Sequence, residues 1–367
     1  MSDALRVQQN ILNNLQEMLP ELLPEHLLTI SMMITGLLRG RSVQLRKMAE
    51  KVAYPNKQTS LIDRFRRFFN NAHIETQIEY NPFVLNILKG LQQNPLYLLI
   101  DSSKIGNSCL TLMVSVYYQH RALPLAWVVY KGRKGHSSQA LQLALLRTVK
   151  SYISPDCQVT LLGDGEFDGC EVLTFLREEA QWQYTCRTDH STLVYWQEQW
   201  LALHDLPVVK GQDAFFTVAL FTQSQQIGPL NIFAAWHETE QCHWFFVTSA
   251  PEIKTAKRWY KKRFTTETLF SDVKKRGFHV ADTRLQKPER IDRLLFVTAV
   301  AYVFTIWFGI DALQTKTYLQ LIRTDEIYYS LFQLGLIYLD HLLNQGKFLP
   351  TFDNFSLPSF LPLFGST

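Results

Sequence analysis

Apolar residues recur at helical spacing through the first part of the chain. Residues 12–19 and 27–37 place them three or four positions apart, the spacing that puts side chains on one face of a helix. Beyond them we expect Ser42 and Ser60 to cap two short helices, because a serine hydroxyl can accept from the free amides of a first turn. Residues 1–92 are therefore predicted to form a helical domain.

The pattern changes from helical spacing to short apolar runs after residue 95. Runs rich in β-branched and aromatic residues alternate with two helical stretches, in the order strand, strand, strand, helix, strand, helix, strand. This order predicts an α/β fold, a mixed sheet of the ribonuclease H-like kind, over residues 93–190. The strands are expected at residues 96–100, 110–118, 123–130, 159–162 and 183–186, and the helices at 137–149 and 170–179.

Residues 191–250 interrupt this rhythm with a β-rich insertion. Three strands are expected there, at residues 214–221, 231–236 and 243–248, with no helix between them. The α/β pattern resumes in residues 251–310, with a long basic helix from Lys254 and then an apolar helix. Residues 311–367 are predicted to form a helical C-terminal region that ends in a Phe- and Pro-rich tail.

The apolar helix is the one segment that resembles a membrane span. Residues 294–310 contain no charge over 17 positions, at the short limit for crossing a bilayer. Polar residues interrupt the run and charged residues flank it, so we interpret it as a buried core helix and expect no membrane partner. Five cysteines form no Cys-x-x-Cys pair, and the chain starts without a signal-like apolar segment. These features predict a cytoplasmic protein.

Positive charge is concentrated in two segments. Residues 38–67 hold nine Lys/Arg against two Asp/Glu, a net charge of +7, and residues 254–293 hold thirteen against five, a net charge of +8. Because the whole chain carries only +4, the remainder is acidic, at −11. Two basic segments on an acidic body predict a polyanionic partner contacted at two places, although either segment alone is also compatible with a solvated helix face.

Three arginines are the candidate DNA-binding residues of the first basic segment. Arg64, Arg66 and Arg67 alternate with phenylalanines on a helix that follows a turn at residues 55–56. Two short helices joined by a turn are compatible with a helix-turn-helix-like DNA reader, and equally with a helical bundle that has a charged surface.

Two aspartates follow apolar strands of the predicted sheet. Asp101 comes after the first strand and Asp164 after the fourth, and these two strands lie side by side in a ribonuclease H-like order. Either residue alone would more simply cap a turn, but together they would converge at one edge of the sheet. Paired carboxylates suit Mg²⁺, and a third carboxylate would complete a two-metal site for phosphoryl transfer.

The basic helix offers that third carboxylate. At about 100° per residue, Tyr260, Arg263, Glu267 and Lys274 fall within an arc of roughly 60°. Such a ridge is compatible with a helix stabilised by ion pairs. It also fits a metal-binding carboxylate flanked by cations that contact phosphates.

The spacing Tyr-x2-Arg-x3-Glu-x6-Lys at these four positions resembles the YREK signature of bacterial DDE transposases of the insertion-sequence-four group. The resemblance implies a ribonuclease H-like core whose acids are Asp101, Asp164 and Glu267. It also implies DNA contacts from Tyr260, Arg263 and Lys274.

Two further segments resemble the same family. Residues 164–168, Asp-Gly-Glu-Phe-Asp, resemble an Asp-Arg-Glu-x-Asp run, with Gly165 in place of the arginine. Glu166 and Asp168 then either support the site or cap a turn. Trp244 resembles a tryptophan that stacks on a flipped DNA base in relatives, although an aromatic residue on a strand can equally belong to the core. Strand alternation points it away from Phe245 and Val247, towards the active-site cleft. Lys104, close after the first aspartate, either contacts DNA or is an ordinary surface lysine.

The resemblance implies the activity of a cut-and-paste transposase. Two Mg²⁺ ions, replaceable by Mn²⁺, would serve cleavage of double-stranded DNA at terminal inverted repeats and then transfer to target DNA. A homodimer on DNA in the bacterial nucleoid is expected. The alternatives are a ribonuclease H-like nuclease, which would lack the Tyr-Arg-Glu-Lys helix, and a catalytically silent protein that binds transposon ends.

Overall fold

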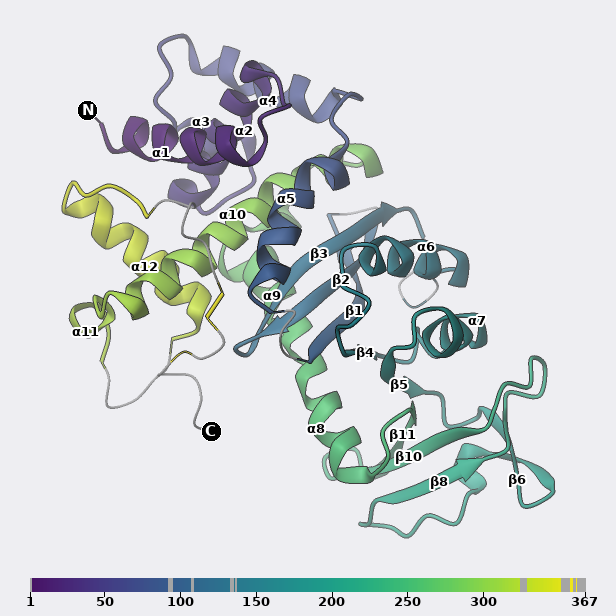
Figure 1. Cartoon of the computed structure of the whole chain (residues 1–367). Helices are drawn as coiled ribbons and strands as arrows, with labels where there is room; N and C mark the ends of the chain where they lie inside the picture. Colours follow the sequence, from purple (N-terminus) through teal and green to yellow (C-terminus); the bar gives the residue numbers. More distant parts are fainter. Residues whose placement is uncertain are drawn as a thin grey trace.

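The computed structural model describes residues 2–91, 95–106, 109–132, 135, 137–323, 329–350, 357–358 and 361. Helices of the N-terminal part lie at one end, a large sheet runs through the middle, and strands of residues 191–250 form the other end (Figure 1). The predicted boundary after residue 92 and most of the Phe- and Pro-rich tail lie outside the described residues.

The helical prediction for the first domain is confirmed, but its capping details are not. α4 begins at Gln58, and the amide of Ser60 already donates to the Lys57 carbonyl at 2.9 Å, so Ser60 lies inside the first turn and caps nothing. Ser42 accepts from the Gln44 amide at 3.3 Å, in the loop before the helix. The five helices are α1 (Asp3–Met18), α2 (Pro24–Gly40), α3 (Leu45–Ala49), α4 (Gln58–Asn70) and α5 (Thr76–Lys89).

The ribonuclease H-like sheet is confirmed in strand order and direction. Its central part has the order β3-β2-β1-β4-β5, with β1, β2 and β3 antiparallel and β1, β4 and β5 parallel. The elements are β1 (Leu96–Ile105), β2 (Cys109–Tyr118), β3 (Arg121–Tyr130), α6 (Gln139–Lys150), β4 (Val159–Gly163), α7 (Cys170–Thr174), the π-helical turn η1 (Phe175–Glu179) and β5 (Gln183–Thr188).

The insertion does not stand apart from this sheet. Its last strand pairs antiparallel with β5, Phe245 opposite Thr188, so three of its strands extend the sheet to eight in the order β5-β11-β10-β8. A separate three-stranded sheet, β7-β6-β9, includes two strands that the sequence pattern did not predict. The elements are β6 (Leu193–Trp196), β7 (Gln199–Ala202), η2 (Leu203–Asp205), β8 (Ala214–Val218), β9 (Leu220–Phe221), β10 (Leu230–His237) and β11 (Cys242–Thr248).

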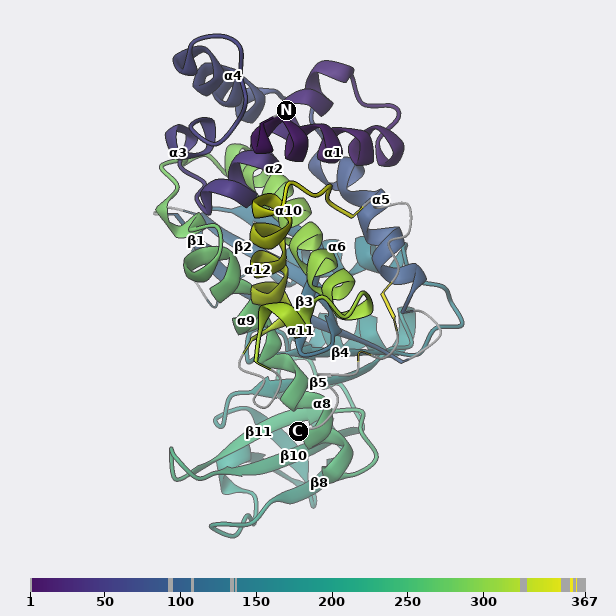
Figure 2. The ribbon, with the colours of Figure 1, turned by 90° about the vertical axis from the view of Figure 1, so that its left-hand side faces the viewer.

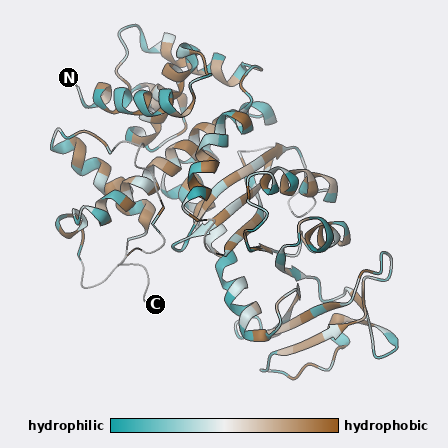
Figure 3. Cartoon of the chain, viewed as in Figure 1, coloured by the Kyte–Doolittle hydropathy of each residue, from teal (hydrophilic) through white to brown (hydrophobic). Residues whose placement is uncertain are grey.

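Residues 294–310 form a core helix, as predicted. They belong to α10 (Pro288–Gln314), and all 17 of them are buried, against β3 on one side and against α2 and α12 (Leu331–Asn344) on the other. In its length and composition α10 resembles a membrane span, but 94% of its apolar window lies inside the protein. The apolar stretch is visible in Figure 3. The short helix α11 (Tyr318–Leu321) connects the two long ones.

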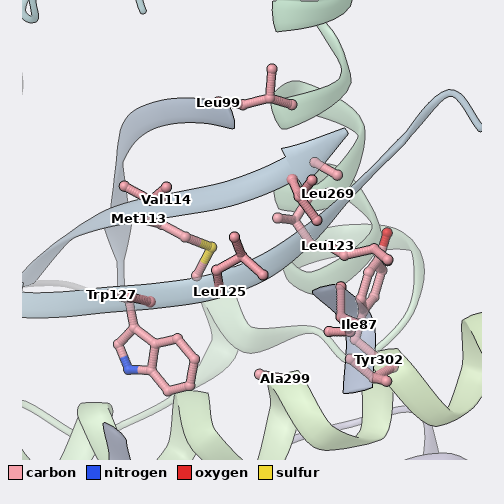
Figure 4. Close-up of a cluster of buried hydrophobic side chains, with 14 of the residues drawn as sticks. Ile87, Leu99, Met113, Val114, Leu123, Leu125, Trp127, Leu269, Ala299 and Tyr302 are labelled. Carbon is pink, nitrogen blue, oxygen red and sulfur yellow. The ribbon is translucent and has the colours of Figure 1, made fainter. Parts of the chain in front are cut away.

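The helices cover both faces of the sheet. α6 and α7 lie on one side, whereas α10 and α12 lie on the other (Figures 1 and 2). Leu123, Leu125 and Trp127 of β3 pack towards Ala299 and Tyr302 of α10 in the core shown in Figure 4. Because both faces are buried, the strands read as continuous apolar runs.

The expectation of one long basic helix is wrong. The segment is divided at Phe264 into α8 (Ile253–Arg263) and α9 (Thr265–Ser271), followed by a π-helical turn η3 (Asp272–Arg276) and a short 3₁₀ turn η4 (Val280–Asp282). The Thr265 hydroxyl donates to the Lys262 carbonyl at 2.8 Å, and the Thr266 hydroxyl shares its one proton between the Arg263 carbonyl and the Asp101 carboxylate, each at 2.9 Å. Threonine side chains that bond back to the preceding turn weaken the backbone ladder and bend a helix.

Candidate active site

The register of two parallel strands brings Asp101 and Asp164 together. Leu99 of β1 is opposite Leu162 of β4, so the two aspartates, each two residues further along, share one end of the strand pair. Asp164 directly follows β4, as expected. Asp101 lies in the middle of β1 and not at its end, because β1 continues to Ile105 in its antiparallel pairing with β2.

Asp101 is a buried carboxylate held in a fixed orientation. It is 7% exposed, and it accepts hydrogen bonds from the Ser102 amide at 2.8 Å and from the Thr266 hydroxyl at 2.9 Å. Burial raises the pKa of Asp101. The positive charge of Arg263 lowers this pKa, whereas the negative charge of Asp164 raises it further. A buried carboxylate beside another one is stabilised by any cation placed between them.

Arg263 places such a positive charge among all three predicted acids. Its Nη2 lies 3.1 Å from Asp164 Oδ2 and 3.6 Å from Asp101 Oδ2, and its Nη1 lies 3.3 Å from Glu267 Oε1. Arg263 is 9% exposed, and its Nε is buried without a hydrogen-bond partner among the residues that the structure describes. The three acids therefore converge on one cation, although 99 and 4 residues separate Arg263 from Asp164 and Glu267 along the chain.

The donor set fits a hard divalent cation. All three side chains offer carboxylate oxygens, the ligands that Mg²⁺ prefers. The side chain of Glu267 is 61% exposed at the start of α9 and is free to change rotamer. Within the described part of the chain, no three His, Cys, Asp or Glu side chains are already arranged as metal ligands. The guanidinium of Arg263 lies among the three carboxylates.

Lys274 also reaches the strand that carries the first aspartate. Its Nζ hydrogen-bonds to Ser103 Oγ, and Ser103 faces the same side of β1 as Asp101, two residues away. Lys104 is exposed and alternates to the opposite side, away from the acids.

Tyr260 is buried and not part of an open ridge. It is 6% exposed and packs against Phe246 of β11, with ring centroids 4.4 Å apart. Burial raises its pKa to about 12. The structure thus brings Arg263, Glu267 and Lys274 to the two strands that carry Asp101 and Asp164, and uses Tyr260 to fix α8 on the sheet.

The segment after Asp164 holds β1 in place beside Asp101. Glu166 accepts from the Ser102 hydroxyl at 2.7 Å and from the Ser137 amide at 2.7 Å, and so joins β1 to the start of α6. Burial raises the pKa of Asp168 to about 6. Gly165 is exposed, and a side chain there would meet only the Arg187 carbonyl, at 3.9 Å.

Trp244 lies in the wall of a cavity that begins at Asp164. The cavity has a volume of about 790 Å³ and also receives Arg187, His190 and Lys210. The Arg187 guanidinium lies 3.9 Å from the centre of the Trp244 ring, and the His237 ring stacks on it at 4.0 Å. Two groups this close cannot share one side of an indole, so both faces of Trp244 are covered by the protein.

Comparison with known families fits this geometry. Residues 100–304, more than half of the chain, match the family described as "Transposase DDE domain". The chain belongs to this DDE transposase family. No curated protein matches the sequence. Among solved structures, the chain is similar to a piggyBac transposase in a synaptic complex with hairpin DNA, with a TM-score of 0.48 and 11% identity over 93% of this chain and 79% of that one.

The matched region of this DDE transposase contains all three acids and Trp244, whereas the candidate DNA-binding arginines of the first domain precede it. Arg64 donates to the Thr29 hydroxyl at 2.7 Å and to the Glu25 carbonyl at 3.1 Å, so it ties α4 to α2. Arg66 and Arg67 are exposed on the same helix. Arg64 is therefore held by the protein itself, whereas Arg66 and Arg67 face solvent.

The sequence pattern did not predict three polar residues of the site. Thr266 and Ser102 both hold Asp101, and Arg187 covers Trp244. Arg187 carries a usable signal, because it is the one charged residue in the strand Gln183–Thr188. Thr266 carries none, since its contact with Asp101 spans 165 residues.

Proposed function

We propose that this DDE transposase cuts DNA at the ends of its own element and transfers the freed ends to a target, with Asp101, Asp164 and Glu267 as metal ligands. The observation that supports this most directly is the convergence of the three carboxylates on the guanidinium of Arg263. Three acids from a strand, a loop and a helix do not gather around one cation for the stability of the fold alone, because buried ion pairs contribute little to it.

In this proposal Asp101, Asp164 and Glu267 would hold two Mg²⁺ ions, which would supply activation of a water or a 3′-hydroxyl and stabilisation of the departing oxygen. Thr266 and the Ser102 amide keep the Asp101 carboxylate in one orientation. Arg263 offsets the negative charge of the three acids, and with metal bound its guanidinium would be close enough to contact the phosphate to be cut. Mn²⁺ should replace Mg²⁺, since both accept carboxylate oxygens.

The proposed partners are double-stranded DNA with terminal inverted repeats, and target DNA. Joining two ends requires two copies of the chain on DNA, so we propose a homodimer in the complex. The place of action would be the bacterial cytoplasm, at the nucleoid.

The decisive experiment compares cleavage with binding. Asp101→Asn, Asp164→Asn and Glu267→Gln should each lower the nicking rate by about 10³-fold or more, since metal coordination contributes several kcal/mol to the transition state. End binding in a gel-shift assay should remain within a few-fold of wild type. If the wild-type chain binds ends but cuts none with Mg²⁺ or Mn²⁺, the protein is a silent end-binding protein. If one variant cuts normally, that residue is not a ligand.

Trp244 is proposed to receive an unstacked base during hairpin formation on the second strand. A base can stack there only after Arg187 or His237 has moved from the indole. Trp244→Ala should spare first-strand nicking and impair the second-strand step, because stacking contributes about 1–3 kcal/mol per base. A duplex with an abasic site at the flipped position should partly restore it. Equal loss of both steps would instead assign Trp244 to the fold.

A further inference from the structure

Four arginines from distant parts of the chain line one groove away from the acids. Arg46 of α3 and Arg66 of α4 form one wall, and Arg284, in the segment before α10, and Arg290, in its first turn, form the other. The groove has a volume of about 610 Å³. In Figure 2, α3 lies beside the green segment that leads into α10. We call these four residues and the space between them the arginine groove.

The arginines of the groove are available to a ligand. Neither the Arg284 nor the Arg290 guanidinium has a hydrogen-bond or ion-pair partner within the described residues, and Arg284 is exposed. Within the described part of the chain, Arg46 and Arg66 pair with Glu50 and Asp63 alone, through side chains that are 83% and 64% exposed. Such exposed pairs are weak and exchange readily for a stronger anion. Asp282 is the one acid in the lining.

The two walls are fixed relative to each other. The Val43 amide donates to the Phe278 carbonyl at 2.9 Å, and Arg293 donates to the Phe69 carbonyl at 3.1 Å. Both bonds join the first domain to the segment around α10, next to the groove. The groove is therefore a preformed site, which reduces the entropic cost of binding.

The groove also has a defined position relative to the acids. Beyond Asp101, β1 runs to Ile105, and the next residue, Gly106, packs against Thr283 in the groove lining, where an added Cβ would lie 3.1 Å from the threonine methyl. Five residues of strand span about 17 Å. Half a turn of B-DNA also spans about 17 Å, and at that spacing the backbone of the complementary strand comes to the same side of the duplex.

We propose that the arginine groove binds backbone phosphates of the complementary strand of the same duplex that is cut at the acids, about half a helical turn from the scissile phosphate. This inference rests on the proposed function. Guanidinium groups bind phosphates bidentately. In the proposed function the acids cut a DNA duplex, whose phosphates half a helical turn away lie at about the distance that separates the groove from Asp101. The groove thus sets the register of the DNA on the acids.

The experiment uses a duplex that carries one transposon end and the double variant Arg284→Gln/Arg290→Gln. The dissociation constant should rise by about tenfold or more, and the slope of log K against log salt should fall by about two, one for each lost phosphate contact. The control is Lys316→Gln/Lys347→Gln, which removes two exposed cations that do not line the groove: Lys316 lies at the far end of α10, about 40 Å from Arg290 along that helix, and Lys347 follows α12, beside Arg6 of α1. The control should bind like wild type.

Neutral methylphosphonates locate the contact. Placed one at a time along the complementary strand, they should weaken wild-type binding most at about five base pairs from the scissile phosphate, and should not weaken the double variant further there. Unchanged affinity of the double variant, or the same methylphosphonate profile as wild type, would overturn the proposal. Wild-type protein that cuts no end at all would instead count against the proposed function, so the two failures are distinguishable.

Discussion

The two basic segments of the chain have nearly the same charge and opposite structural environments. Residues 38–67 carry a net +7, and the ion pairs of Arg46 and Arg66 lie in solvent, whereas Arg41 pairs with Asp340 through a side chain that is 25% exposed. Residues 254–293 carry a net +8, but Arg263 and Arg293 are buried at 9% and 8% exposure, on carboxylates and carbonyls of the protein itself. The net charge of a sequence segment therefore differs from the charge that its exposed side chains present to a ligand.

The difference has a functional consequence. In the proposed function, cations buried among acids organise the site, whereas exposed cations are the ones that can contact DNA. The second segment does both, since Arg284 is exposed while Arg263 is not. The following predictions separate these two uses of positive charge.

The largest expected effect concerns the buried ion pair that attaches residues 254–293 to the sheet. Arg121 of β3 donates to Asp272 at 3.1 Å, and the two side chains are 13% and 1% exposed. Arg121→Ala should destabilise the fold by about 3–5 kcal/mol, because it leaves a buried carboxylate unpaired. Urea unfolding measures this. Arg147→Ala, which breaks an exposed pair with Glu179, is the control and should change little.

The same variant has a predictable pH dependence. Burial raises the pKa of Asp272 to about 6 even with Arg121 present. Between its ordinary pKa and the raised one, the folded state binds more protons than the unfolded state, so the stability contributed by Asp272 falls as pH rises. Without Arg121 this fall should continue above pH 6. The gap between variant and wild type should therefore widen from pH 5 to pH 8, and a constant gap would show that Asp272 does not titrate in the folded protein.

The next effect concerns the cation among the acids. Arg263→Gln removes a positive charge within 3.1–3.6 Å of three carboxylates. Affinity for Mn²⁺, measured by calorimetry without DNA, should rise by about 10- to 100-fold, as expected for the loss of a competing charge. Arg293→Gln, which removes an arginine of the same segment that touches no acid of the site, should leave this affinity unchanged. If Arg263→Gln binds Mn²⁺ no better than wild type, the guanidinium and the metal do not compete.

A smaller effect is expected from the exposed arginines of the first segment. Arg66→Gln and Arg67→Gln should each lower the salt slope of end binding by about one, and change stability by no more than about 0.5 kcal/mol. Binding titrations at several salt concentrations, together with urea unfolding, measure both. A salt slope equal to that of wild type would remove these residues from the DNA interface.

The smallest effect on DNA binding is expected from Arg64, which lies on the same helix as Arg66 and Arg67. Its hydrogen bonds to Thr29 and Glu25 hold α4 on α2, so Arg64→Gln should cost about 1 kcal/mol of stability and leave the salt slope unchanged. If Arg64→Gln lowers the salt slope of end binding and leaves the free energy of unfolding unchanged, Arg64 contacts DNA. The distinction between arginines bonded within the protein and arginines exposed to DNA would then be wrong.

Much of this fold and site was determined by local sequence. The period of apolar residues gave the strand and helix order up to β5 and the buried helix α10, because burial acts on each segment in the same way wherever it lies in the fold. The acids at 101, 164 and 267 followed from that order and from the resemblance of Tyr260, Arg263, Glu267 and Lys274 to a family signature.

Only the tertiary structure decided where the remaining groups stand. Helical geometry alone placed Tyr260 and Arg263 on one ridge, but the threonines at 265 and 266 divide the helix, Tyr260 is buried, and Arg263 turns to the acids. The arginine groove joins residues more than 200 positions apart. Periodicity reports which side of a segment is buried, whereas the partner of a charged side chain depends on which distant segments pack beside it.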